Sequence, residues 1–138
     1  MNYHILLITL LFTFTKSYGQ SKIVTGTILS EDLEPLSGAY IQTLDSAIIV
    51  RANEKGDFAI ELPSEINELF AWFIAMESDT IVLDGRCHVN LILLNDYIIE
   101  FSTVREAQKH FDKRKRNLSP IYKKAYELGL FRNEMPCS

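Results

Sequence analysis

The sequence predicts a mainly β domain, a sandwich or barrel of seven short strands, followed by about two helices. Between Lys22 and Asn95, short apolar runs alternate with turn residues. Within that region, the stretch Thr25–Leu62 contains two Gly-bearing turns and ends in an alternation of large apolar with small or acidic residues. After Asn95 the apolar residues recur at helical spacing instead.

The seven strands are expected where the apolar runs lie. Their predicted ranges are Ile23–Leu29, Ala39–Leu44, Ala47–Ala52, Asp57–Leu62, Leu69–Ala75, Asp79–Leu83 and His88–Leu94. In the fourth run, Phe58, Ile60 and Leu62 are expected to share one face. The run from Leu69 to Met76 is apolar at both alternating positions. This pattern predicts a strand buried on both sides, or one that a helix covers on its outer face.

Two helices are expected after the strands. Thr103 and Glu106 have the spacing of a capping box, and Val104, Ala107 and Phe111 follow on one face. A second helix is expected to begin with Ser119 as its cap and Pro120 in its first turn. Its apolar face comprises Ile121, Tyr122, Ala125, Tyr126 and Leu128, and Gly129 can end it in a left-handed turn.

The first residues predict export. Ile5–Phe14 is apolar but too short to span a bilayer as a helix. Ser17, Tyr18 and Gly19 follow it, which favours a signal peptide over 1–19 that is cut before Gln20. A membrane anchor is the alternative. The expected organisation is a signal peptide at 1–19, a β-domain at 20–95 and a basic helical extension at 96–138, in a periplasmic, outer-membrane-associated or secreted protein.

The expected mature chain holds two cysteines, Cys87 and Cys137. An even pair in an exported protein permits a disulfide. We expect Cys137 to lie in a loose segment, so two free thiols are the favoured state and the disulfide is the alternative.

The net charge of −4 hides an asymmetry. Residues 20–99 contain four basic and thirteen acidic residues, whereas residues 100–138 contain nine basic and five acidic ones. Such a division indicates a tail that docks on its own domain or reaches an acidic partner. The candidate partner-binding residues in the tail are Lys109, Lys113, Arg114, Lys115, Arg116, Lys123 and Lys124. A solvated helix face is the simpler interpretation of these charges.

Two turn motifs resemble those of the carboxypeptidase regulatory-like domain, a transthyretin-like (Ig-like) Greek-key β-sandwich. Gly26 lies in the first strand, Pro35-Leu36-Ser37-Gly38-Ala39 forms one turn, and Asn53-Glu54-Lys55-Gly56-Asp57-Phe58 forms the next. The resemblance covers roughly residues 22–95, although Ala75-Met76 replaces the family's usual Gly-Tyr. Similar domains occur in the Gram-negative envelope, ahead of TonB-dependent transporters and after the catalytic domain of some zinc carboxypeptidases.

The motif residues have structural explanations. Pro35 fixes φ in a turn, Gly38 and Gly56 supply turn conformations that glycine favours, and Phe58 is a core anchor. Gly26, Pro35, Gly38, Gly56 and Phe58 are therefore expected to be scaffold residues.

No catalytic or cofactor motif emerges from the remaining residues. Neither His88 nor His110 has a glutamate three positions later, as a zinc carboxypeptidase pair requires. The acidic turns lack the spacing of a calcium-binding EF-hand loop, and no Gly-x-Ser-x-Gly nucleophile motif occurs. Phe70, Trp72 and Phe73 are candidates for a sugar-stacking platform, but their apolar neighbours favour the core.

We therefore expect a non-enzymatic exported module without a cofactor. Its expected partner is a protein of the cell envelope, and contact with a membrane surface is also compatible with the basic tail. Nucleic acid is not expected as a partner of an exported protein. The alternative is a carbohydrate- or peptide-binding module that serves nutrient uptake at the outer membrane.

Overall fold

The computed structural model describes residues 19–96 and 103–138. The predicted signal peptide lies outside these residues except for Gly19. Within the described ranges, no helix has the length and apolar character needed to cross a membrane.

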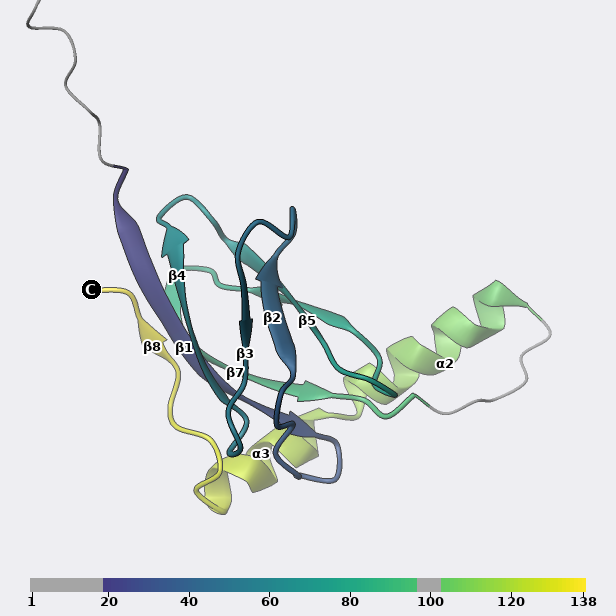
Figure 1. Ribbon diagram of the computed structural model, residues 1–138. Helices are drawn as coiled ribbons and strands as arrows, with labels where there is room; N and C mark the ends of the chain where they lie inside the picture. The colour runs from purple at the N-terminus through teal and green to yellow at the C-terminus, as the bar shows by residue number, and fades with distance from the viewer. Residues whose placement is uncertain (1–18, 97–102) are drawn as a thin grey trace, which may run out of the picture.

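The described chain forms two four-stranded sheets and two C-terminal helices (Figure 1). The first sheet has the order β4-β1-β7-β8 and the second has the order β3-β2-β5-β6. The strands are β1 (Ser21–Ser30), β2 (Tyr40–Thr43), β3 (Ile49–Arg51), β4 (Asp57–Pro63), β5 (Glu68–Trp72), β6 (Asp79–Val82), β7 (Arg86–Leu93) and β8 (Met135–Pro136). The predicted mainly β class with helices after the strands is confirmed. Each predicted run overlaps a strand, and β8 is an eighth strand that the sequence did not predict.

The first sheet is built around β1. This strand pairs antiparallel with β4, where Gly26 faces Phe58, and parallel with β7, where Thr25 faces His88. All other pairings are antiparallel, including β7 with β8. β1 therefore lies inside the first sheet, between β4 and β7.

The main core lies between the inner faces of the two sheets. Phe58, Ile60 and Leu62 are buried as predicted, whereas Ala59 and Glu61 are exposed. Gly26 permits this packing, because a Cβ there would lie 1.8 Å from the Val89 carbonyl oxygen and 2.8 Å from the Phe58 ring. Gly56 has φ +77°, and a Cβ there would lie 2.3 Å from the Ile28 carbonyl oxygen. Both positions therefore require glycine.

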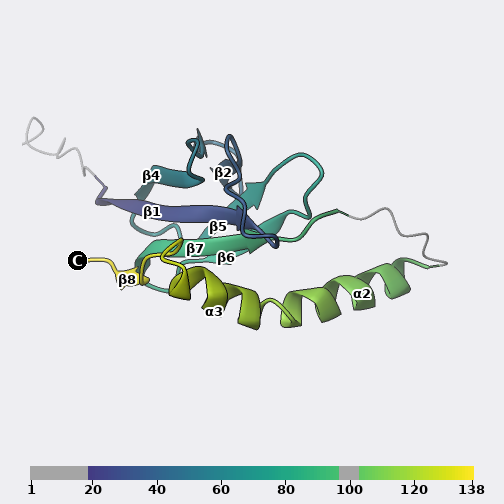
Figure 2. The ribbon, with the colours of Figure 1, turned by 90° about the horizontal axis from the view of Figure 1, so that it is seen from below.

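A second apolar cluster covers one end of the outer face of the first sheet. Leu29, Ile92 and Leu94 from the sheet pack against Leu118, Ala125 and Phe131. Figure 2 shows the helices along one side of the β-domain, next to β7 and β8. The β-domain is thus covered on one side by residues from its own C-terminal region.

The helices are α2 (Val104–Arg116) and α3 (Ser119–Glu127). The Thr103 hydroxyl accepts a hydrogen bond from the Glu106 N–H at 3.2 Å, as expected for the predicted cap. The prediction that Ser119 caps α3 is wrong. Leu118 is the cap residue, since its apolar side chain is buried in the second cluster and this packing sets where the helix begins. Gly129 has the expected left-handed conformation, with φ +72°.

The prediction that Leu69–Met76 is buried on both sides is wrong. In β5, Leu69 and Ala71 point into the core, whereas Phe70 and Trp72 lie on the outer face. Trp72 is 37% exposed, so the expectation that it belongs to the core is also wrong. The reason is that the apolar residues of the C-terminal region pack on Leu29 and Ile92 of the first sheet and not on the outer face of β5.

The expectation of two free thiols is wrong as well. Cys87 and Cys137 form a disulfide, with their Cα atoms 4.7 Å apart. Residues 130–137, the strap, turn back after α3 and run beside β7 (Figure 1). The Asn90 side chain donates to the Arg132 carbonyl oxygen at 2.7 Å, and Arg86 forms an ion pair with Glu134. The strap is therefore fixed to the sheet rather than loose.

Candidate interaction surfaces

The predicted basic residues of the tail divide into two groups. Arg114 forms an ion pair with Glu31 at 2.7 Å, and Lys115 forms one with Asp79 at 2.6 Å. These two side chains join α2 to the sandwich. The others point to solvent, although Lys123 lies 3.9 Å from Glu127 on its own helix. The exposed members of the predicted set are Lys109, Lys113, Arg116, Lys123 and Lys124.

The predicted motif residues occupy scaffold positions. Gly26 and Gly56 permit close backbone approach, and Phe58 is buried between the sheets. Pro35 forms an isolated bridge with Leu29, and Gly38 has φ +82° in the turn before β2. None of the five presents a reactive side chain.

The outer face of the second sheet, which we call the open face, carries a ladder of three side chains across three strands. The Arg51 guanidinium lies 5.0 Å from the Tyr40 ring centroid. Tyr40 in turn stacks on Trp72, with centroids 4.2 Å apart and planes 9° from parallel. The Trp72 indole N–H donates to Gln42 at 2.9 Å, which fixes the orientation of the ring. These contacts hold the aromatic surface in one conformation.

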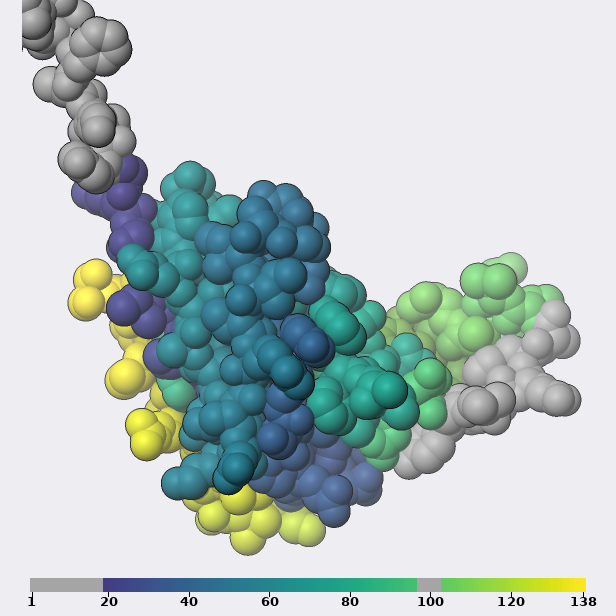
Figure 3. Space-filling view, viewed as in Figure 1, coloured from purple at the N-terminus to yellow at the C-terminus, as the bar shows by residue number. Residues whose placement is uncertain are grey.

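Two exposed aliphatic side chains extend the open face to both edges of the sheet. Ile49 on β3 is 50% exposed, and Val82 on β6 is 47% exposed. Figure 3, viewed from this side, shows no helix over the β2–β3 hairpin. The open face comprises Tyr40, Gln42, Ile49, Arg51, Glu68, Phe70, Trp72, Thr80 and Val82. Sequence reasoning missed this surface, because it depends on the pairing of β2 with β5.

A polar pocket of about 220 Å³ lies on the first sheet, beside the strap. Its residues include Thr25, Asp57, His88 and Arg132. His88 is 8% exposed, and its Nδ1 atom lies 2.8 Å from the Thr25 hydroxyl oxygen. Its Nε2 atom is buried without a hydrogen-bond partner among the described residues. The alternation of polar residues in β1 and β7 was the available sequence signal for this site.

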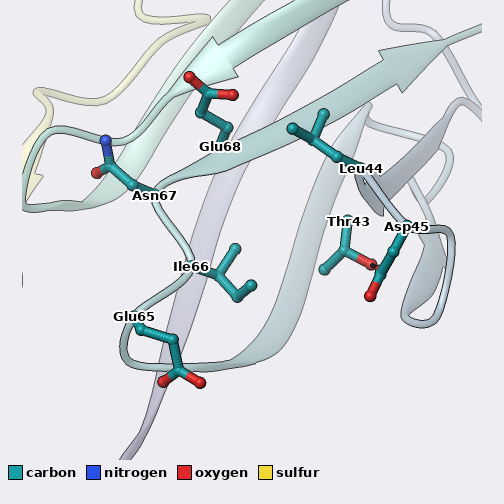
Figure 4. A pocket seen from close by; sticks show the side chains of 7 residues that line it. All are labelled: Thr43, Leu44, Asp45, Glu65, Ile66, Asn67 and Glu68. Carbon is teal, nitrogen blue, oxygen red and sulfur yellow. Dashed lines mark hydrogen bonds between the residues drawn. The ribbon is translucent and has the colours of Figure 1, made fainter.

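A pocket of about 390 Å³ lies at one end of the sandwich. Figure 4 shows that the carboxylates of Asp45, Glu65 and Glu68 point in different directions there. The Thr43 hydroxyl donates to Asp45 and lowers the pKa of that carboxyl group. No group of three metal-ligating side chains occurs in the part of the chain that the structure describes.

Tyr122 connects α3 to the first sheet. Its hydroxyl oxygen accepts a hydrogen bond from the Ile92 N–H at 3.0 Å. Burial raises the pKa of Tyr122 to about 12, and the nearby carboxylates of Asp79 and Glu134 act in the same direction. The neutral phenol is therefore the form that fits beneath the helix.

Comparison with known proteins finds no match to a protein-family model and none to a curated protein sequence. The open face, the exposed cations and the polar pocket therefore have to be interpreted from their own geometry.

Proposed function

We propose that this protein is a non-enzymatic, exported β-sandwich module that binds a protein of the cell envelope through its open face. We also propose that the chain belongs to the carboxypeptidase regulatory-like family and that its sandwich has a Greek-key, transthyretin-like topology. The glycine requirements at Gly26 and Gly56 support the family. The Cys87–Cys137 disulfide supports export, because such bonds persist in oxidising compartments.

The observation that carries the proposal is the unequal cover of the two sheets. On the outer face of the first sheet, Leu29 and Ile92 are buried under the chain's own C-terminal region, whereas the open face keeps Ile49, Trp72 and Val82 exposed. Aromatic residues and arginine are enriched at protein interfaces, and ordered side chains lose little entropy on binding. The Arg51–Tyr40–Trp72 ladder contains these residue types, and its contacts already order the side chains.

The test is affinity capture from envelope extract with variants of matched chemistry. Ile49→Glu and Val82→Glu place a charge on the open face, and each is expected to abolish retention of the partner. Ile23→Glu makes the same change at an exposed position on β1 of the first sheet and serves as the control. Circular dichroism checks that all three remain folded. Equal retention by the open-face variants and the control would reject the proposal.

Carbohydrate binding is the second candidate, and the exposure of Trp72 is the observation that favours it. Protein binding is preferred because Tyr40 already covers one face of the indole, leaving less surface for a sugar ring. Trp72 is the chain's one tryptophan, so its fluorescence reports on this position directly. A saturable change in emission on titration with envelope polysaccharides would favour the carbohydrate candidate.

A further inference from the structure

Four cations form a stripe along α2 on the side away from the sandwich. They are Arg105, Lys109, Lys113 and Arg116, which we call the basic stripe. Their spacing of four, four and three residues places them within an arc of about 80° on a helix that advances 100° per residue. The stripe is about 16 Å long at the helical rise. Arg105 was not among the residues predicted from the sequence.

The opposite side of α2 is already engaged. Phe111 packs on the second apolar cluster, and Arg114 and Lys115 form their ion pairs with Glu31 and Asp79. These contacts fix the rotation of the helix, so the basic stripe points outward. All four of its side chains are exposed, and none forms an ion pair within the described ranges.

Two acidic residues lie close to the basic stripe on α2. Asp112 borders it and accepts a hydrogen bond from Gln108 at 2.9 Å, and Glu106 lies next to Arg105. Four cations against two anions still leave a positive surface. The acidic residues of the sandwich that contact α2, Glu31 and Asp79, lie on the far side of the helix.

We propose that the basic stripe is an electrostatic docking surface for an anionic phospholipid bilayer. A line of cations on a helix that extends beyond the sandwich can approach a plane of phosphate groups without a complementary shape (Figure 2). The basic stripe contains no aromatic residue with which nucleic-acid bases could stack. In this orientation α2 lies along the membrane surface, and the open face remains available to another partner.

The test is co-sedimentation of the full chain with vesicles. The quantity compared is binding to phosphatidylcholine vesicles containing phosphatidylglycerol minus binding to vesicles of phosphatidylcholine alone. This difference removes any contribution that apolar residues 5–14 make equally to both. Each cation near the surface changes the partition coefficient about fivefold. The double variant Lys109→Glu/Lys113→Glu is therefore expected to have a partition coefficient onto the anionic vesicles that is more than about tenfold lower than that of the wild type. Molar salt is expected to release the wild-type protein, because it screens exposed charges.

The control is Lys55→Glu/Lys124→Glu, which changes the net charge equally at two exposed positions outside α2. It is expected to bind as the wild type does, and thermal melting checks that both double variants are folded. A wild-type protein with no preference for anionic vesicles would overturn the proposal and leave an acidic protein as the candidate occupant. Equal losses in the two double variants would also overturn it, because net charge alone would then explain the binding.

Discussion

The two sheets have similar inner faces but different outer faces. On the first sheet, Leu29, Ile92 and Leu94 are covered by α3 and the strap. On the second, Tyr40 and Trp72 contact each other and remain partly exposed. One face therefore gains stability from tertiary burial, and the other keeps a surface that a partner can reach. The difference indicates that the stability of the fold depends on the covered side of the molecule, whereas the binding that we propose would use the opposite side.

The largest expected effect follows from removing the disulfide that holds the strap on the first sheet. The bond closes a loop of 50 residues, and the chain-entropy estimate for such a loop is about 4 kcal/mol. Cys87→Ser/Cys137→Ser is therefore expected to lower the free energy of unfolding by about this amount. Urea denaturation monitored by circular dichroism measures it. A loss below about 1 kcal/mol would mean that the remaining strap contacts suffice.

The next effect concerns the apolar contacts beneath the helices. Phe131 is buried and its ring lies 5.5 Å from that of Tyr126 and 5.8 Å from that of Tyr122. Phe131→Ala is expected to cost about 3 kcal/mol, because it removes a ring and leaves a cavity. The matched control is Val82→Ala on the open face, which is expected to cost about 0.5 kcal/mol. Similar urea midpoints for the two variants would contradict the comparison.

The pH dependence of stability should also come from the covered face. Burial raises the pKa of Tyr122 to about 12, above the ordinary value of 10.0. The stability associated with the neutral phenol is fully present below pH 10 and is lost as the pH rises through 12. The loss amounts to about 2 to 3 kcal/mol. Stability measured against pH in this window, with Tyr122→Phe as the control, checks it. An equally steep decline in Tyr122→Phe would exclude Tyr122 as the cause.

The smallest expected effect is the coupling energy between the two stacked aromatic side chains of the open face. A stacked aromatic pair contributes about 1 kcal/mol beyond its buried area. A double-mutant cycle with Tyr40→Ala and Trp72→Ala is therefore expected to give a coupling energy of about 1 kcal/mol. Zero coupling would indicate that the ladder is not ordered in solution.

Much of the fold could be predicted from the sequence because it rests on local signals. The alternation of Phe58, Ile60 and Leu62, the Thr103 cap and the Gly129 turn each depend on residues close in the chain. The disulfide and β8 could not be predicted, since the route of the strap depends on Phe131 packing beneath the first sheet. The exposure of Trp72 was missed because it depends on which sheet the helices cover.

The candidate surfaces were predicted less well than the strands. The sequence identified Lys109, Lys113 and Arg116 but did not separate them from Arg114 and Lys115, which the structure turns toward the sandwich. The spacing from Arg105 to Arg116 was the signal that could have found the basic stripe. The open face had no comparable signal, because Arg51, Tyr40 and Trp72 lie on three different strands.

The parallel pairing of β1 with β7 has a consequence for folding kinetics. Thr25 lies beside His88, 63 residues later in the sequence. A central strand whose neighbour arrives so late requires the closure of a long loop before its contacts can form, and such topologies fold slowly. Under the export that we propose, slow folding would lengthen the time during which the chain remains extended enough to be threaded through a translocation channel. The pairing that completes the sheet would then favour folding after transport.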